Sequence, residues 1–149
     1  MNPLPNSCTG KVNEEDFAAS MVQLTSKSFA PPRNESLELY ARLRSDDTLK
    51  EIKVSFSLSV VGQLQQLLPD TGLVRVTYKD NTNPSTPITY TQESGTAFPQ
   101  FDTVKNMYTG TLTNVVVVND DDDVRKTLTL NIRFEATEAA LEQANARAA

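Results

Sequence analysis

Histidine is absent from this 149-residue sequence, and cysteine occurs only once, at Cys8. Without histidine, a serine–histidine or cysteine–histidine nucleophile pair cannot form within one chain, and histidine-ligated zinc is also excluded. A single cysteine rules out an intramolecular disulfide framework and a multi-cysteine metal cage. The commonest hydrolytic and zinc sites are therefore excluded before any pattern is considered.

Glycine and long apolar runs are also scarce. The five glycines form neither a G-x-x-x-x-G-K-[ST] phosphate loop nor a G-x-G-x-x-G fingerprint. No apolar run approaches the roughly 20 residues of a membrane-spanning helix, and the first 30 residues lack the apolar centre of a secretory signal. We therefore expect a soluble, untargeted protein that is not an enzyme and has no cofactor, no bound metal and no membrane partner.

Apolar residues alternate with polar ones over much of the middle of the chain, which is typical of antiparallel strands with one buried face. SLELYARLR and KEIKVSFSLSV predict a hairpin around the turn RSDDT, and LVRVTYKD predicts a third strand. The residues expected on the buried face are Leu37, Leu39, Ala41, Leu43, Ile52, Val54, Phe56, Leu58, Val60, Val74, Val76 and Tyr78.

The remaining candidate strands have less regular sequence patterns. PITYTQE is a candidate edge strand because prolines precede it, and ESGTAFPQFDT is expected to be irregular. NMYTGTLTNVVVV and VRKTLTLNIRFEA predict the clearest strand–turn–strand unit, with Leu128, Leu130, Ile132 and Phe134 on one face. The fold class expected is mainly β, an antiparallel sheet of about five to six strands.

The two ends of the chain are expected to differ from this core. The sequence predicts a single domain over 1–149, made of an arm at 1–32, a β core at 33–136 and a C-terminal helix at 137–149. Within the arm, NEEDFAASMVQL favours a short helix capped by Asn13, whereas TGKV and SFA favour pairing at a sheet edge, and both interpretations stay open. The alanine-rich tail is too short to be a stable helix alone, so it should dock on another surface.

Four consecutive aspartates, Asp120 to Asp123, interrupt the last hairpin. A calcium loop spaces its carboxylates at alternate positions around a glycine, which this run lacks. The pattern favours a solvated turn whose charge discourages aggregation, with a weak cation site shared between subunits as the alternative. Asp46 and Asp47 are interpreted as turn residues in the same way.

Charge is sorted by position, although the net charge is −5. Acidic residues gather in predicted turns, whereas cations fall on predicted strands, at positions opposite in parity to the buried set. We expect these cations, Arg42, Lys53, Arg75, Lys79 and Arg133, to bind nucleic acid through phosphate contacts that do not depend on base sequence. The simpler alternative is that long basic side chains only solvate the sheet.

The last 45 residues, KNMYTGTLTNVVVVNDDDDVRKTLTLNIRFEATEAALEQANARAA, resemble the C-terminal part of single-stranded RNA bacteriophage coat proteins. The shared order is long strand, loop, long strand and then a helix starting T-E-x-A. The resemblance implies a sheet that lines a shell and contacts RNA, helices that clasp a second subunit, and dimers that tile an icosahedral capsid. It puts Lys105, Asn106 and Tyr108 at the head of the first strand and Arg133 on the second, where that family has polar, inward-facing groups.

These patterns lead to one expected function and two alternatives. The expectation is a bacteriophage virion structural protein that self-assembles in the host cytoplasm into a symmetric capsid shell, with one sheet face toward packaged nucleic acid. A tail-tube or head-decoration protein of a tailed phage would have a similar composition. A monomeric adaptor that binds protein partners by strand addition is the non-viral alternative.

Overall fold

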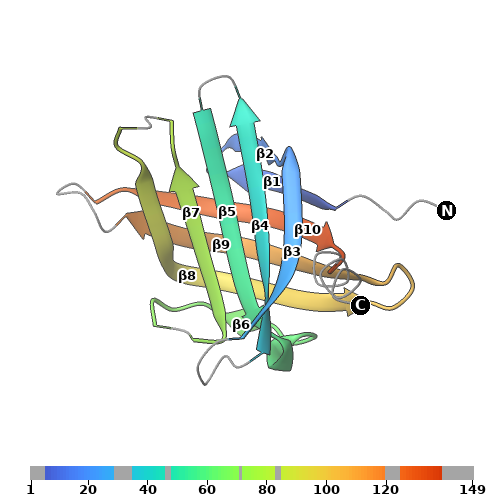
Figure 1. Cartoon of the computed structure of the whole chain (residues 1–149). Helices are drawn as coiled ribbons and strands as arrows, with labels where there is room; N and C mark the ends of the chain where they lie inside the picture. The colour runs from blue at the N-terminus through green and yellow to red at the C-terminus, as the bar shows by residue number, and fades with distance from the viewer. Residues whose placement is uncertain are drawn as a thin grey trace.

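A computed structural model describes residues 6–28, 35–45, 48–70, 72–82, 85–119 and 125–138. In this part of the chain the fold is mainly β, a 10-stranded antiparallel sheet with the order β2-β1-β10-β9-β8-β7-β5-β4-β3, in which β6 pairs with β8 (Figure 1). The strands are β1 (Ser7–Val12), β2 (Glu15–Ala18), β3 (Met21–Ser28), β4 (Glu35–Ser45), β5 (Thr48–Ser57), β6 (Gln65–Gln66), β7 (Val74–Asp80), β8 (Ile88–Asp102), β9 (Met107–Asn119) and β10 (Thr127–Ala136). One 3₁₀ turn, η1 (Leu58–Val60), follows β5.

The sheet curls, so that β3, β4, β5 and β7 run across β8, β9 and β10 in Figure 1. One continuous core fills the space between these two halves. The Phe56 ring on β5 lies 6.1 Å from the Phe134 ring on β10, measured between centroids. Large aromatic side chains therefore join strands that are far apart in the sheet order, and their burial is a main source of the stability of the fold.

Alternation places the predicted residues on the buried face. The fully buried ones are Leu37, Leu39, Ala41, Ile52, Val54, Phe56, Val60, Val74, Val76, Tyr78, Leu130, Ile132 and Phe134. Leu43 and Leu128 are partly buried. Leu58 is the exception: it is 41% exposed, because alternation stops where β5 gives way to η1.

The prediction of five to six strands is wrong, because the sheet has ten. Residues 7–28 contribute β1, β2 and β3, so the helical interpretation of NEEDFAASMVQL is wrong, and the TGKV segment is extended but lies between β2 and β10 and not at a sheet edge. β8 is a 15-residue interior strand, not an edge strand followed by an irregular segment. Thr137 and Glu138 are not helical, and the rest of the expected 137–149 helix lies outside the described residues.

Two of the predicted turns have the expected flanking strands. β4 ends at Ser45, which is paired with Thr48 at the start of β5. β9 ends at Asn119, which accepts a hydrogen bond from the Lys126 backbone N–H through its side-chain oxygen at 2.7 Å. Asp46, Asp47 and Asp120 to Asp123 themselves lie outside the described residues. The interpretation of the aspartates as a solvated turn therefore stays a prediction.

A buried glutamine replaces the strand ladder where β7 and β8 separate. Their pairing stops at Thr77 and Thr91, and the Gln92 side chain extends into the gap beyond. Its oxygen accepts the Val76 N–H at 2.7 Å, and its nitrogen donates to the carbonyls of Val74 at 3.1 Å and Leu68 at 2.9 Å. Backbone groups that would otherwise be buried without partners are thereby hydrogen-bonded.

Neighbouring bulges on β8 and β9 add to the curl of the sheet. The β9–β10 register shifts near Asn131, where Asn114 adopts a left-handed φ of 49° and donates its N–H to the Asn131 side-chain oxygen at 2.9 Å. The β8–β9 register shifts at Gly95, which has a φ of 113°. Bulges bend a strand and increase its local twist, which helps the two halves of the sheet to face each other.

Candidate nucleic-acid interface

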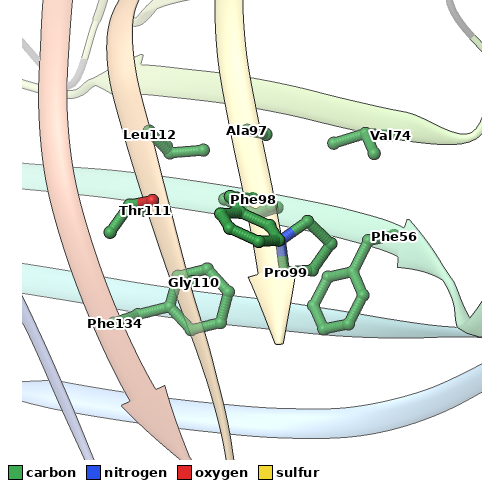
Figure 2. Close-up of a pocket in the computed structure, with 10 residues that line it drawn as sticks. Phe56, Val74, Ala97, Phe98, Pro99, Gly110, Thr111, Leu112 and Phe134 are labelled. Atoms are coloured by element: carbon green, nitrogen blue, oxygen red, sulfur yellow. The ribbon is translucent and has the colours of Figure 1, made fainter. Parts of the chain in front are cut away.

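The space between Phe56 and Phe134, in the part of the core that the structure describes, has no room for a ligand. Figure 2 shows the side chains around one internal space, whose cavity volume is about 10 Å³. There the Phe134 ring lies against Gly110, so closely that a Cβ on this glycine would be 2.3 Å from two ring carbons. A volume of this size accommodates at most one water molecule. Binding at this place has to use the outside of the sheet.

Four of the five predicted cations lie together on the outer face. Arg42 is on β4, Lys53 on β5, and Arg75 and Lys79 on β7, on three strands that are neighbours in the sheet. Lys53 and Lys79 are exposed, and the two arginines are half-buried. All four alternate with core residues, as predicted.

Arg133 does not join this group. It lies on β10, which is separated from β7 in the sheet by β9 and β8. Its guanidinium lies 3.1 Å from the Glu135 carboxylate on the same strand, and Lys105 lies 3.6 Å from that carboxylate. Residues 105–108, singled out by the phage-coat resemblance, lie at the β8–β9 turn and the start of β9. The five predicted cations therefore lie in two separate regions, with four of them in the first.

The strand register arranges the first group in rows. Arg42 is opposite Glu51, which is opposite Lys79. In the next row Tyr40 is opposite Lys53, which is opposite Thr77. Directly opposed side chains in a sheet have Cβ atoms about 5 Å apart, so the groups within each row are immediate neighbours.

These rows form a groove on the outer face. Its lining residues are Tyr40, Glu51, Lys53, Thr77, Lys79 and Thr89, and its volume is about 200 Å³. We call it the outer groove. Lys53 and Lys79 form no ion pair with any residue in the described ranges. Their charges are thus available to an anion from solution.

A hydrogen bond fixes the aromatic side of the outer groove. The Tyr40 hydroxyl donates to the Glu51 carboxylate across the β4–β5 pair. Burial, and then this carboxylate, raise the pKa of Tyr40, and nearby Arg42 acts in the opposite direction. The phenol therefore stays protonated at neutral pH and keeps its donor role.

Arg75 has a different local role. Its guanidinium donates to the Pro69 carbonyl at 2.8 Å and so holds the connection between β6 and β7. Glu38, on the same face, is paired with Lys27 at 3.1 Å. The part of the outer face available for anions is thus centred on Lys53 and Lys79.

The sequence alone identified the lysines but did not assign Tyr40, Glu51, Thr77 or Thr89 to the site. Their outward parity was visible in the sequence, whereas their convergence depends on the pairings β4–β5, β5–β7 and β7–β8. Among the described residues, no group of three or more Asp, Glu or Cys side chains is arranged to hold a metal ion. No helix in the described ranges is long and apolar enough to cross a membrane.

Comparisons of this chain with protein-family models, curated proteins and solved structures found no match.

Proposed function

We propose that this protein is a virion structural subunit that assembles with copies of itself into a shell and contacts packaged nucleic acid through its outer groove. The observation that carries this proposal is the gathering of Arg42, Lys53 and Lys79 on one face of neighbouring strands, within a chain whose net charge is −5. A local positive field on an acidic protein favours a polyanion at that face alone.

The chemistry of the outer groove supports phosphate as the group recognised. Ammonium groups and threonine hydroxyls donate hydrogen bonds to phosphate oxygens without distinguishing bases. Such contacts release counterions, and on a single strand each phosphate neutralised contributes about −0.7 to the slope of log affinity against log salt concentration. Arg42, Lys53 and Lys79 together correspond to a slope of roughly −2.

A matched pair of variants tests the nucleic-acid contact. The double variant Lys53→Gln/Lys79→Gln should lose roughly tenfold or more in affinity for a 20-nucleotide RNA at low salt and have a shallower salt slope by about 1.4. The control Lys105→Gln/Lys126→Gln removes the same charge away from the outer groove and should bind like the unmodified protein. Equal losses in both variants would mean that net charge alone matters, and would remove the proposed interface.

Assembly is tested on the purified chain. Size-exclusion chromatography and negative-stain microscopy should reveal closed particles, and their absorbance ratio at 260 and 280 nm should indicate enclosed nucleic acid. A monomer at high protein concentration with no absorbance from nucleic acid would overturn the shell assignment.

A second candidate function is supported by the edge of the sheet. β3 is the last strand in the sheet order, and β4 is its one ladder partner. β3 has a single lysine and no proline, and Asn6 bonds its Val22 carbonyl, so an extended peptide from a partner would pair along the part of this edge beyond Val22. Under this alternative the protein remains a monomer and binds a peptide instead of nucleic acid.

A further inference from the structure

We infer that the outer groove is selective for single-stranded nucleic acid, with one base stacked against Tyr40 and adjacent phosphates on Lys53 and Lys79. This inference rests on the proposed contact between the outer groove and nucleic acid, and it names the form of nucleic acid that the groove takes.

Each lysine of the outer groove is paired with a threonine hydroxyl. Lys53 on β5 is directly opposite Thr77 on β7, and Lys79 on β7 is directly opposite Thr89 on β8. The same lysine–threonine pair thus occurs twice. The second pair lies one strand further along the sheet order and two residues further along β7 than the first. Two consecutive phosphates of one strand can each meet an ammonium group and a hydroxyl, which are the donors that bind phosphate without reading sequence.

The aromatic ring of the outer groove lies beside the first of these lysines. Tyr40 is directly opposite Lys53, and its hydroxyl is held by Glu51, which restricts the ring to the groove. A ring that is already fixed loses little conformational freedom when a base stacks on it. Stacking between bases and aromatic side chains is the usual way in which proteins hold single strands, and it does not depend on which base is present.

The size of the outer groove restricts the ligands that it can hold. The outer groove, at about 200 Å³, is smaller than the roughly 300–1,000 Å³ of sites for drug-sized ligands. It suits one unstacked nucleotide and not a folded ligand. In a duplex the bases are paired and stacked inside, so only the backbone could approach this surface and Tyr40 would contribute nothing.

Glu51 reduces the attraction of the outer groove for any polyanion. Its carboxylate lies between Arg42 and Lys79 in the same row and reduces the positive field there. Its hydrogen bond from Tyr40 nevertheless keeps the ring in place. Glu51→Gln retains an acceptor for the tyrosine and removes the negative charge. This variant should therefore raise the affinity for every nucleic acid a few-fold while retaining the preference for single strands.

The experiment compares four fluorescently labelled ligands by anisotropy on the full-length chain: a 12-nucleotide single-stranded DNA, the same sequence as RNA, its duplex, and a single strand with abasic sites at all central positions. The single strands should bind roughly tenfold more tightly than the duplex and the abasic strand, because stacking contributes about 1–3 kcal/mol per base. Tyr40→Leu should lose that preference, whereas Tyr40→Phe, which keeps the ring but loses its bond to Glu51, should retain only part of it.

The outcomes separate this inference from the proposed function. If all four ligands bind equally and Tyr40→Leu has no effect, while Lys53→Gln/Lys79→Gln abolishes binding, the preference for single strands is overturned and the nucleic-acid contact stands. If none of the ligands binds, both are overturned. The abasic strand tests stacking on the unmodified protein, so the result does not depend on whether Tyr40→Leu folds.

Discussion

Gln92 is the residue on which the junction between β7 and β8 depends. It is 2% exposed and makes three hydrogen bonds with backbone groups of Val76, Val74 and Leu68. A single side chain thus replaces the ladder bonds that the separating strands can no longer form. Unpaired backbone groups at this depth would each cost about 1–3 kcal/mol.

Replacing Gln92 with leucine should therefore destabilise the fold strongly. Gln92→Leu keeps the approximate volume but leaves the Val76 N–H and two carbonyls without partners, so we expect a loss of about 3 kcal/mol in unfolding free energy. Urea denaturation followed by circular dichroism measures the change. Gln100→Leu, on an exposed position of the same strand, is the control and should change stability by less than about 0.5 kcal/mol. Equal stability of Gln92→Leu and the unmodified protein would refute this account.

Cys8 should make stability fall at alkaline pH. Burial raises the pKa of its thiol from 9.0 to about 12. Above pH 9 the unfolded chain releases the thiol proton while the folded chain retains it. The contribution of Cys8 is therefore complete below pH 9 and is lost as pH rises toward 12, with a slope of up to about 1.4 kcal/mol per pH unit.

Cys8→Ala isolates this effect. Tyr78 also has a pKa raised by burial, so it contributes to the alkaline decline in both proteins. Unfolding free energies measured at pH 8, 9 and 10 under reducing conditions should decline less steeply in Cys8→Ala than in the unmodified protein. Parallel declines would show that the thiol takes no part.

At the level of elements, regular alternation allowed strands β4, β5, β7, β9 and β10 to be predicted from the sequence. β8 was missed as one strand because Gly95, Pro99 and two register shifts interrupt its pattern. Pro99 is tolerated because it lies beyond the last pair with β6, at Ala97, where an N–H is no longer needed on that side.

The N-terminal strands were left undecided between helix and strand for a different reason. Asn13 was a candidate helix cap, but it adopts a φ of 55° in the turn between β1 and β2. Its side-chain oxygen accepts the N–H of Thr129, and its own N–H donates to the carbonyl of that residue. Asn13, which the sequence suggests as a local helix cap, thus makes a long-range contact with β10 instead. The candidate site could likewise be predicted only in part. Alternation along the strands identified Lys53 and Lys79 as outward-facing, but only the pairing of the strands shows that Arg133 lies in another part of the sheet.

The bulge at Gly95 should tolerate no side chain, whereas the one at Asn114 should accept glycine. A Cβ at Gly95 would be 2.5 Å from the Val115 Cα and 2.6 Å from the Asn114 carbonyl oxygen, and both are backbone atoms. Gly95→Ala should therefore cost about 2–4 kcal/mol through overpacking and strain. Asn114→Gly keeps the left-handed conformation available and should stay within about 1 kcal/mol. Thermal unfolding of both variants gives the comparison, and a Gly95→Ala protein as stable as Asn114→Gly would contradict it.

For the whole molecule, Asn6 links three parts of the curled sheet. Its side-chain nitrogen donates to the Val22 carbonyl on β3 at 3.2 Å, and its oxygen accepts the Thr137 N–H at 3.0 Å. These bonds connect the residue before β1 with an edge strand and with the end of β10. Asn6 thereby holds together the two margins of the sheet, which are not paired to each other as strands.

Asn6→Ala should loosen this closure more than it disturbs the core. We expect a loss of about 1–2 kcal/mol and faster hydrogen exchange at the Thr137 amide. Asn6→Asp keeps the acceptor for Thr137 but cannot donate to Val22, so its stability should be intermediate. Exchange of the Leu39 amide, in the core of β4, serves as the internal reference. An unchanged Thr137 exchange rate in Asn6→Ala would argue against the role given to Asn6.

The pairing of β1 with β10 determines when this fold can be completed during synthesis. Ser7 on β1 is paired with Glu135 on β10, so the β1–β10 pairing cannot form until β10 has been synthesised. The β4–β5 hairpin, whose partners are adjacent in the chain, can form much earlier. The emergence of β10, and not the appearance of the first strands, should therefore be the event that closes the sheet.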